Sequence, residues 1–314
     1  TVVWEAQQPC ENQLLLRHFH ADGEAGFPGN VTVRMMYTLT DDNGFRIDYE
    51  AETDRDTLFC PTNHAYFNLA GMETPTTSIE DHLVRINADF YLPIDMNTNN
   101  TGEVRAVGDT PFDFRDYHSI GERINRKDLQ LLNGHGYDHC FVLKKPALHE
   151  LSFAATCISP SSGRRMDIYT TEPGLIMYTG NYLPGFTGMH GTVYPRRSAV
   201  CFETQCFPDT PNNPHFPSIV LREGDLYKQT VFINQYATMK TESFLFGMLL
   251  AFLQLRAQVN TNQQHLCNPN SFSIVLLGDP QNYVKYDYNQ PVLADDGVDR
   301  SSYRLPPCKG GALY

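Results

Sequence analysis

Residues 31–52 read VTVRMMYTLTDDNGFRIDYEAE. On both sides of the central DDNG, apolar side chains alternate with polar or charged ones, so each extended segment has one apolar face and one charged face. This pattern is typical of an antiparallel sheet with one buried face. Asn43-Gly44 can adopt the positive φ angles that a tight hairpin turn requires. We therefore predict two antiparallel strands, at 31–39 and 45–52, joined by a turn at 41–44.

Shorter strand-like segments continue along the chain, separated by clusters of Gly, Pro, Asn and Asp. They begin with Val2–Trp4 and include 83–88, 141–144, 149–158, 165–170, 175–178, 198–203 and 227–233. Before residue 239, only residues 117–132 have a pattern that predicts a helix. Many short strands without alternating helices favour an all-β protein over one built from βαβ units. We predict a twisted antiparallel β-sandwich over residues 1–237.

The composition limits the kinds of partner that we expect. The chain has 314 residues, of which 41% are hydrophobic, and its formal net charge is −12. Such a chain is an ordinary globular protein without the basic surface that nucleic acid or an anionic membrane requires, so we expect neither partner. The eight cysteines form no C-x-x-C pair and match no common zinc or disulfide pattern. We interpret most of them as buried thiols in a reducing compartment, and we expect a cytoplasmic protein.

A second stretch contains a histidine between two asparagines. It reads Asn63-His64-Ala65-Tyr66-Phe67-Asn68-Leu69. The alternation predicts a strand with His64 and Tyr66 on one face. A histidine in this position suits proton transfer, because its reference pKa of about 6.5 lies close to working pH. The alternative is a core histidine whose hydrogen bonds are satisfied by the neighbouring amides, and the stretch alone leaves both interpretations open.

A third stretch contains a carboxylate among apolar residues. It reads Cys201-Phe202-Glu203-Thr204-Gln205 and is followed by Phe207-Pro208-Asp209. Residues 202–205 and 208–209 resemble the catalytic-glutamate motif of the aldose 1-epimerases, or galactose mutarotases. Residues 63–69 resemble the catalytic-histidine motif of the same family. The resemblance extends over residues 1–237, with the motifs in the family's order, and it implies the galactose mutarotase-like supersandwich fold.

The resemblance also implies a reaction and its residues. The family interconverts the α and β anomers of hexoses such as glucose and galactose, by acid–base opening and closure of the pyranose ring without a metal or another cofactor. By this match His64 is the general acid and Glu203 the general base, and we expect them to face each other across a sugar-sized gap. Asp138 and Asn181 lie in further matching motifs and are expected to bind sugar hydroxyls. Ile176 stands where the family often has a glutamine.

Two sugar-binding motifs of the family are absent from the sequence. One is a G-R-x-x-N-R-type motif with an arginine, and the other is an N-x-L-H-G-G-type motif with a histidine. Both belong to the family's N-terminal region, so we expect a chain that is N-terminally truncated relative to the family. Two functions therefore compete, an aldose 1-epimerase and an inactive, sugar-binding remnant of one.

The composition changes at Met239. Residues 239–258 contain a short apolar run and resemble a secretory signal peptide, although a buried core helix has the same pattern. Residues 259–314 include an apolar run that ends at Asp279 and resembles the first strand of calcineurin-like metallophosphoesterases. The further metal-ligand motifs are absent, which argues against a phosphoesterase. We predict a β domain over 1–238, followed by a fused segment with a short apolar helix and an irregular tail that builds no metal site.

Overall fold

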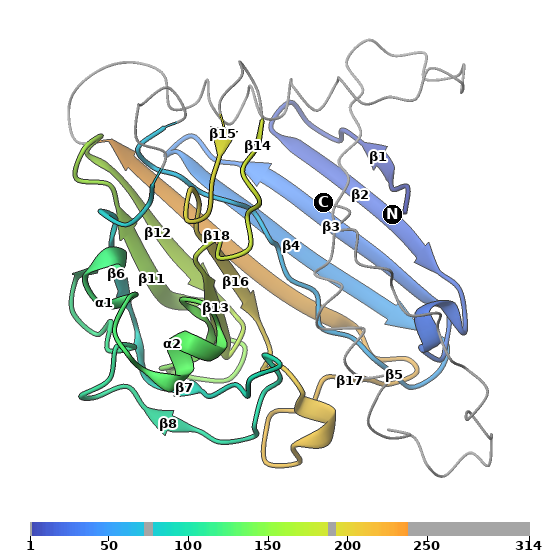
Figure 1. Ribbon diagram of the computed structural model, residues 1–314. Coiled ribbons are helices and arrows are strands. Elements are labelled where there is room, and N and C mark those ends of the chain that lie inside the picture. The colour runs from blue at the N-terminus through green and yellow to red at the C-terminus, as the bar shows by residue number, and fades with distance from the viewer. Residues whose placement is uncertain (1, 72–77, 188–192, 238–314) are drawn as a thin grey trace.

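The computed structural model describes residues 2–71, 78–187 and 193–237, and these form two main antiparallel sheets (Figure 1). The large sheet has nine strands in the order β1-β2-β3-β4-β18-β12-β11-β6-β9, and the small sheet has five in the order β16-β13-β10-β7-β8. The strands of the large sheet are Glu5–Gln7 (β1), Gln13–His20 (β2), Val31–Leu39 (β3), Gly44–Thr53 (β4), Tyr227–Ala237 (β18), Arg164–Thr170 (β12), Ser152–Ile158 (β11), Leu83–Ile86 (β6) and His118–Ser119 (β9). Those of the small sheet are Cys201–Gln205 (β16), Gly174–Tyr178 (β13), Asp138–Leu143 (β10), Ala88–Leu92 (β7) and Arg105–Ala106 (β8).

Short elements complete the described fold. Two further ladders pair Thr57–Leu58 (β5) with Val220–Leu221 (β17), and Phe186–Thr187 (β14) with Val193–Tyr194 (β15). The helical elements are Glu24–Gly26 (η1), Ile120–Arg123 (α1), Leu129–Asn133 (α2) and Thr210–Asn212 (η3). Across the residues that the structure describes, no helix has the length and apolar character needed to cross a membrane.

The predicted hairpin is confirmed. β3 and β4 pair antiparallel along their whole length, and Asn43 in the turn has a φ of 62°. Met35 and Ile47 point from one face into the main core. On the other face Arg34 and Glu52 form an ion pair at 3.3 Å. The alternation of the sequence is therefore the alternation of the two sheet faces.

The core lies between the two sheets. The main cluster of buried apolar side chains takes Leu16, Met35 and Ile47 from the large sheet, and Phe141 and Leu175 from the small sheet. Burying a side chain of this kind stabilises the fold by about 1.5–3 kcal/mol. Two sheets that share one core form a β-sandwich, so the prediction of an all-β antiparallel sandwich is confirmed.

Two of the predicted strands do not form. Val2–Trp4 precedes β1 and is not itself a strand. The stretch 63–69 forms only an isolated bridge, between Phe67 and Val200. The reason is local, because Asn63 Oδ1 accepts a hydrogen bond from the Ala65 N–H at 3.1 Å. Such a side-chain bond to the nearby backbone competes with strand pairing.

The predicted helix over 117–132 is wrong in extent. Residues 118–119 form the edge strand β9, and α1 and α2 are separate short helices. Asp128 divides them, because its carboxylate accepts hydrogen bonds from two backbone N–H groups of α2 and so caps a new helix. The predicted strand at 83–88 is likewise two strands, broken at Asn87, where the chain passes from β6 in the large sheet to β7 in the small sheet.

The interpretations of the last part of the chain lie outside the described residues. They are the signal-like segment at 239–258, the fragment at 259–314 and its Asp279, and the domain boundary at residue 238. All of them stay predictions.

Candidate active site

Glu203 lies in the middle of β16, and all five residues of this strand are buried. Successive side chains of a strand point to opposite faces. Phe202 belongs to the main core, whereas Cys201 belongs to a second cluster with Ile176 and Tyr178 of β13. Glu203 therefore shares the face of Cys201 and points away from the main core, with its side chain 2% exposed.

His64 reaches Glu203 on the irregular segment that runs beside β16. Two backbone hydrogen bonds of 2.9 Å hold Phe67 against the residue before β16. On the other side of the histidine, Thr62 Oγ1 donates to the Thr204 carbonyl at 3.2 Å. The segment is thus fixed to the strand at both ends, and His64 Nε2 lies 3.4 Å from Glu203 Oε1.

The two residues predicted as acid and base come together, but the predicted gap between them is wrong. His64 and Glu203 are in contact, not a sugar's width apart. The ring oxygen and the anomeric oxygen of a pyranose are bonded to the same carbon. An acid and a base that serve these two oxygens must therefore lie close together. The contact also suits the ligand-free protein, because a buried carboxylate is costly without a partner beside it.

Aromatic rings surround His64. The ring centroids of Tyr66 and Tyr178 lie 5.0 Å and 5.8 Å from that of the imidazole. Tyr178 in turn stacks with Tyr182, and the centroids of the two rings lie 6.4 Å apart. Tyr66 is 41% exposed and Tyr182 is 40% exposed, so solvent reaches the rings beside the histidine. The alternation placed Tyr66 beside His64, but no sequence signal selected Tyr182.

Asp138 lies on the same face of the small sheet. It begins β10 and pairs directly with Tyr178 of β13. Residues directly opposite in an antiparallel pair point to the same face, and Tyr178 shares its face with Glu203. Burial, and after it the charge of Asp138, raises the pKa of Tyr182. The sheet thus brings together Asp138 and Glu203, which are far apart in sequence.

Asn181, the fourth predicted site residue, is committed to contacts inside the protein. The residue is 5% exposed. Its Nδ2 donates to the carbonyls of Gly134 and Tyr137 at 3.0 Å and 2.9 Å, and its Oδ1 accepts from Thr179 Oγ1 at 2.8 Å. Both N–H groups are engaged, so neither can donate to a sugar. The predicted sugar contact of Asn181 is therefore corrected to a structural role in the loop that leads into Asp138.

Replacing Asn181 with alanine tests this correction. The buried Gly134 carbonyl would lose its donor, whereas the Tyr137 carbonyl would keep hydrogen bonds from the Thr179 N–H and Oγ1. A buried unsatisfied group costs about 1–3 kcal/mol, so we expect a loss of about 1–3 kcal/mol in the free energy of unfolding. Urea unfolding measures it. The control is Asn234→Ala, whose amide donates to a surface hydroxyl and whose loss should change stability by about 0.5 kcal/mol or less. An Asn181→Ala protein with unchanged stability and weaker sugar binding would restore the original interpretation.

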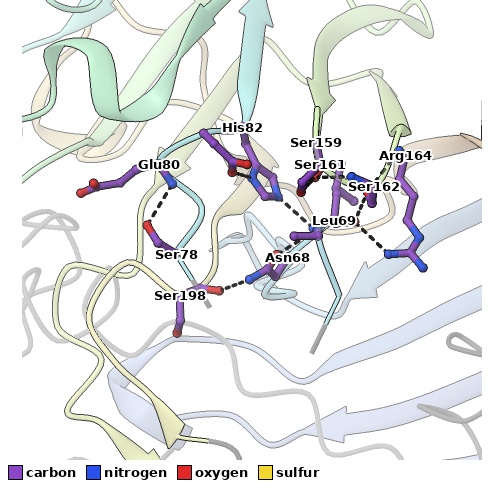
Figure 2. A network of polar contacts seen from close by, with 12 residues as sticks. Asn68, Leu69, Ser78, Glu80, His82, Ser159, Ser161, Ser162, Arg164 and Ser198 are labelled. Carbon is purple, nitrogen blue, oxygen red and sulfur yellow. Dashed lines mark hydrogen bonds and ion pairs between the residues drawn. The ribbon is translucent and has the colours of Figure 1, made fainter. Parts of the chain in front are cut away.

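A second network holds the far end of the histidine segment (Figure 2). The Leu69 carbonyl accepts hydrogen bonds from Ser162 Oγ at 2.6 Å and from Arg164 Nη1 at 3.1 Å, at the turn where β11 leads into β12. Asn68 Nδ2 donates to the Ser198 carbonyl at 2.9 Å. The second asparagine of the motif thus anchors the segment to the chain just before β16.

His82, which the sequence analysis did not select, completes this network. Its fully buried ring accepts a hydrogen bond from the Leu69 N–H through Nε2 at 3.0 Å (Figure 2). The ring proton therefore lies on Nδ1, which donates to Asp81 Oδ1 at 2.8 Å. Burial lowers the pKa of His82, which favours this neutral form. His82 is the satisfied core histidine of the region, and nothing in its sequence context distinguishes it.

The arrangement suits proton transfer. It places an imidazole against a buried carboxylate, with a second carboxylate on the same sheet face and aromatic rings beside them. In the ranges 2–71, 78–187 and 193–237, no three or more His, Cys, Asp and Glu side chains are grouped to hold a metal ion.

Comparison with known proteins places this chain in a family. A family model described as "Aldose 1-epimerase" matches residues 1–233. The chain belongs to the aldose 1-epimerase family. The galactose mutarotase of Rattus norvegicus is 41% identical over 234 residues, which are 74% of this chain and 65% of that protein. The aldose 1-epimerase of Haemophilus influenzae is 37% identical over 231 residues, which are 72% of this chain and 65% of that protein. The chain spans about 65% of the length of these relatives.

Solved structures of epimerases share the fold. An aldose epimerase homologue from C. elegans has a TM-score of 0.67 and 27% identity, over 75% of this chain and 69% of that chain. The galactose 1-epimerase from Lactobacillus acidophilus has a TM-score of 0.63 and 28% identity, over 75% of this chain and 67% of that chain. The predicted family and its β-sandwich are confirmed.

Proposed function

We propose that this protein is an aldose 1-epimerase that interconverts the α and β anomers of hexoses such as glucose and galactose. The observation that carries the proposal is the contact of 3.4 Å between His64 Nε2 and Glu203 Oε1. Family membership supports it, because relatives at 37% and 41% identity are named aldose 1-epimerase and galactose mutarotase. The activity is a proposal for this chain, which spans about 65% of their length.

The proposed mechanism moves one proton at each of two oxygens. Glu203 accepts the proton of the anomeric hydroxyl while His64 donates a proton to the ring oxygen. The bond between the ring oxygen and C1 breaks, and an open aldehyde forms. Rotation about the C1–C2 bond presents the other face of the aldehyde, and the same two groups then close the ring in reverse. Each positioned acid or base contributes roughly 10²–10⁴-fold in rate.

Sugar binding replaces the direct contact between the two residues. In this proposal the anomeric and ring oxygens enter beside His64 and Glu203 and take the place of the contact between the two side chains. Asp138 accepts a hydrogen bond from a sugar hydroxyl on the same sheet face. Tyr66 covers an apolar face of the sugar ring, because the face of an aromatic side chain packs well against the C–H groups of a sugar. Ile176, opposite Glu203 in the ladder, contributes apolar surface where a glutamine would add a hydrogen bond.

We also propose a reducing compartment, such as the cytoplasm, for the protein. None of the six described cysteines is joined in a disulfide. Most of them are buried, and burial raises the pKa of the Cys206 thiol to about 11. Such thiols are packing residues with little thiolate at neutral pH.

The second candidate is a protein that binds sugar without catalysis. It rests on two positions of the described site: Ile176 stands where the family often has a glutamine, and Asn181 spends both of its amide N–H groups inside the protein. With fewer contacts to the sugar hydroxyls, the ring would be oriented less well at His64 and Glu203. Binding would then persist without acceleration of the reaction.

Polarimetry decides between the two. The optical rotation of fresh α-D-glucose and α-D-galactose is followed with the 314-residue chain, with His64→Asn as the matched control. We expect the chain to equilibrate the anomers faster than the spontaneous reaction, and the His64→Asn variant to approach the spontaneous rate. A wild-type rate equal to the spontaneous rate contradicts the epimerase proposal. Calorimetric binding of glucose in that case supports the second candidate.

A further inference from the structure

One backbone carbonyl connects the segment that carries His64 to the strand that carries Glu203. The carbonyl of Thr204, the residue after Glu203, accepts hydrogen bonds from Gln229 Nε2 at 2.9 Å and from Thr62 Oγ1 at 3.2 Å. Thr62 lies two residues before His64. The segment of the histidine and the strand of the glutamate therefore meet at one oxygen atom. Gln229 ties that atom to the large sheet.

β16 depends on such a tether because it is an edge strand. In the described part of the small sheet it pairs with β13 on one side only. On its other side it is held at Thr204 by side chains, and just before the strand by the bridge between Phe67 and Val200. A strand with few backbone partners moves more easily than one inside a sheet. Movement of β16 would carry Glu203 away from His64.

The surroundings of Gln229 fix its side chain. It lies on β18, which pairs with β4 on one side and β12 on the other, and it is 2% exposed. Its Oε1 accepts a hydrogen bond from the Tyr227 hydroxyl at 3.0 Å. Because a hydroxyl donor holds the oxygen end of the amide, the N–H end faces the Thr204 carbonyl. If the Gln229 amide were flipped, its Oε1 would face the Thr204 carbonyl oxygen, and two acceptors would be in contact.

Building on the proposed function, we infer that Gln229 is a positioning residue for mutarotation, which fixes Thr204 and thereby the separation of His64 and Glu203. Its amide acts through the backbone of β16 and not on the sugar. Its loss should therefore lower kcat and leave KM nearly unchanged. Misplacement of catalytic groups by about 1 Å costs on the order of 10²-fold. Because Thr62 still holds the same carbonyl, we expect a smaller loss of about 10-fold.

The test compares two buried glutamines of β18. Gln229→Leu removes the donor and keeps a similar volume. Gln235→Leu is the matched control, because Gln235 is also buried and an even number of residues away on the same face. Polarimetry with α-D-glucose gives kcat and KM. Gln229→Leu should lower kcat about 10-fold and change KM by less than about 2-fold, with both constants unchanged in Gln235→Leu. Equal kcat values for the two variants overturn the inference.

Nuclear magnetic resonance of the histidine rings tests the tether without turnover. The His64 ring resonances should shift in Gln229→Leu and stay in place in Gln235→Leu, and unshifted His64 resonances in both overturn the tether. This readout stands even when the wild-type chain shows no mutarotation, so it separates failure of the tether from failure of the proposed function.

A milder variant serves where Gln229→Leu does not fold. Tyr227→Phe removes the hydroxyl that donates to Gln229 Oε1 at 3.0 Å and that also lies 3.4 Å from Glu172 Oε1. We expect the His64 ring resonances to shift and kcat to fall about 3-fold, the effect of one neutral hydrogen bond. The absence of both effects overturns the inference.

Discussion

Replacing Glu203 with glutamine is expected to lower the rate of mutarotation by about 10²–10⁴-fold, the contribution of a positioned general base. The amide has nearly the shape of the carboxylate, but it cannot accept the anomeric proton. The fold should survive, because the side chain is 2% exposed and a neutral amide is cheaper to bury than a charge. Optical rotation of fresh α-D-glucose measures the rate, and thermal unfolding shows that the protein remains folded.

The same chemical change elsewhere provides the control. Glu50 lies on β4 and pairs with Lys228 at 3.7 Å on an exposed part of the large sheet. Glu50→Gln also removes one negative charge, and it should leave the rate unchanged. A Glu203→Gln protein with the full wild-type rate would show that another group is the base, and the proposed mechanism would be wrong.

Replacing Glu172 with glutamine is expected to stabilise the protein at alkaline pH. Glu172 is 4% exposed, and its Oε1 lies 3.4 Å from the Tyr227 hydroxyl. Lys145 also acts on this carboxyl, and the charge of Glu172 in turn raises the pKa of the Cys60 and Cys206 thiols. Burial raises the pKa of Glu172 from 4.5 to about 7, and the hydroxyl and the lysine offset this only in part.

The sign of the effect follows from proton binding. Between its unfolded pKa and its folded pKa, Glu172 holds more protons in the folded protein, so stability falls as the pH rises from about 4.5 to about 7. A pKa shift of this size corresponds to about 3 kcal/mol in the free energy of unfolding. The amide of glutamine does not titrate in this pH range. We therefore expect Glu172→Gln to be more stable than the wild type by up to about 3 kcal/mol at about pH 8, and nearly equal to it at about pH 5.

Urea unfolding at the two pH values measures this difference. Glu150→Gln is the control, because Glu150 is exposed and its replacement should give the same small difference at both values. A Glu172→Gln advantage that does not grow with pH would show that the buried carboxyl is already ionised at about pH 5.

The sequence predicts those features that depend on local alternation. The hairpin of β3 and β4 follows from apolar residues at every second position and from Asn43-Gly44 in the turn. The histidine segment breaks this rule, because Asn63 bonds the backbone of Ala65 and prevents the strand that the alternation predicts. Local patterns indicate which faces are apolar, and side-chain bonds to the backbone decide where strands end.

The candidate site could be predicted only in part. Motifs identify His64 and Glu203, but not that they touch. Their contact depends on bonds between distant residues, such as the one that joins Thr62 to Thr204 across 142 positions. Gln229 is a polar residue in an alternating strand, and such residues usually face solvent. Its burial follows from the packing of one sheet on the other, which no local pattern contains.

The place of β18 has a consequence for how the chain reaches its native state. This strand, orange in Figure 1, lies between β4 and β12, and its Thr230 donates to Asp48 of β4 across 182 positions. During synthesis, β1–β4 emerge from the ribosome long before the strand that joins them to β12. Two unpaired edges must therefore persist in the nascent chain, and pairings across such long separations form slowly. We expect the growing polypeptide to depend on chaperones until residues 227–237 arrive, because open edges invite aggregation.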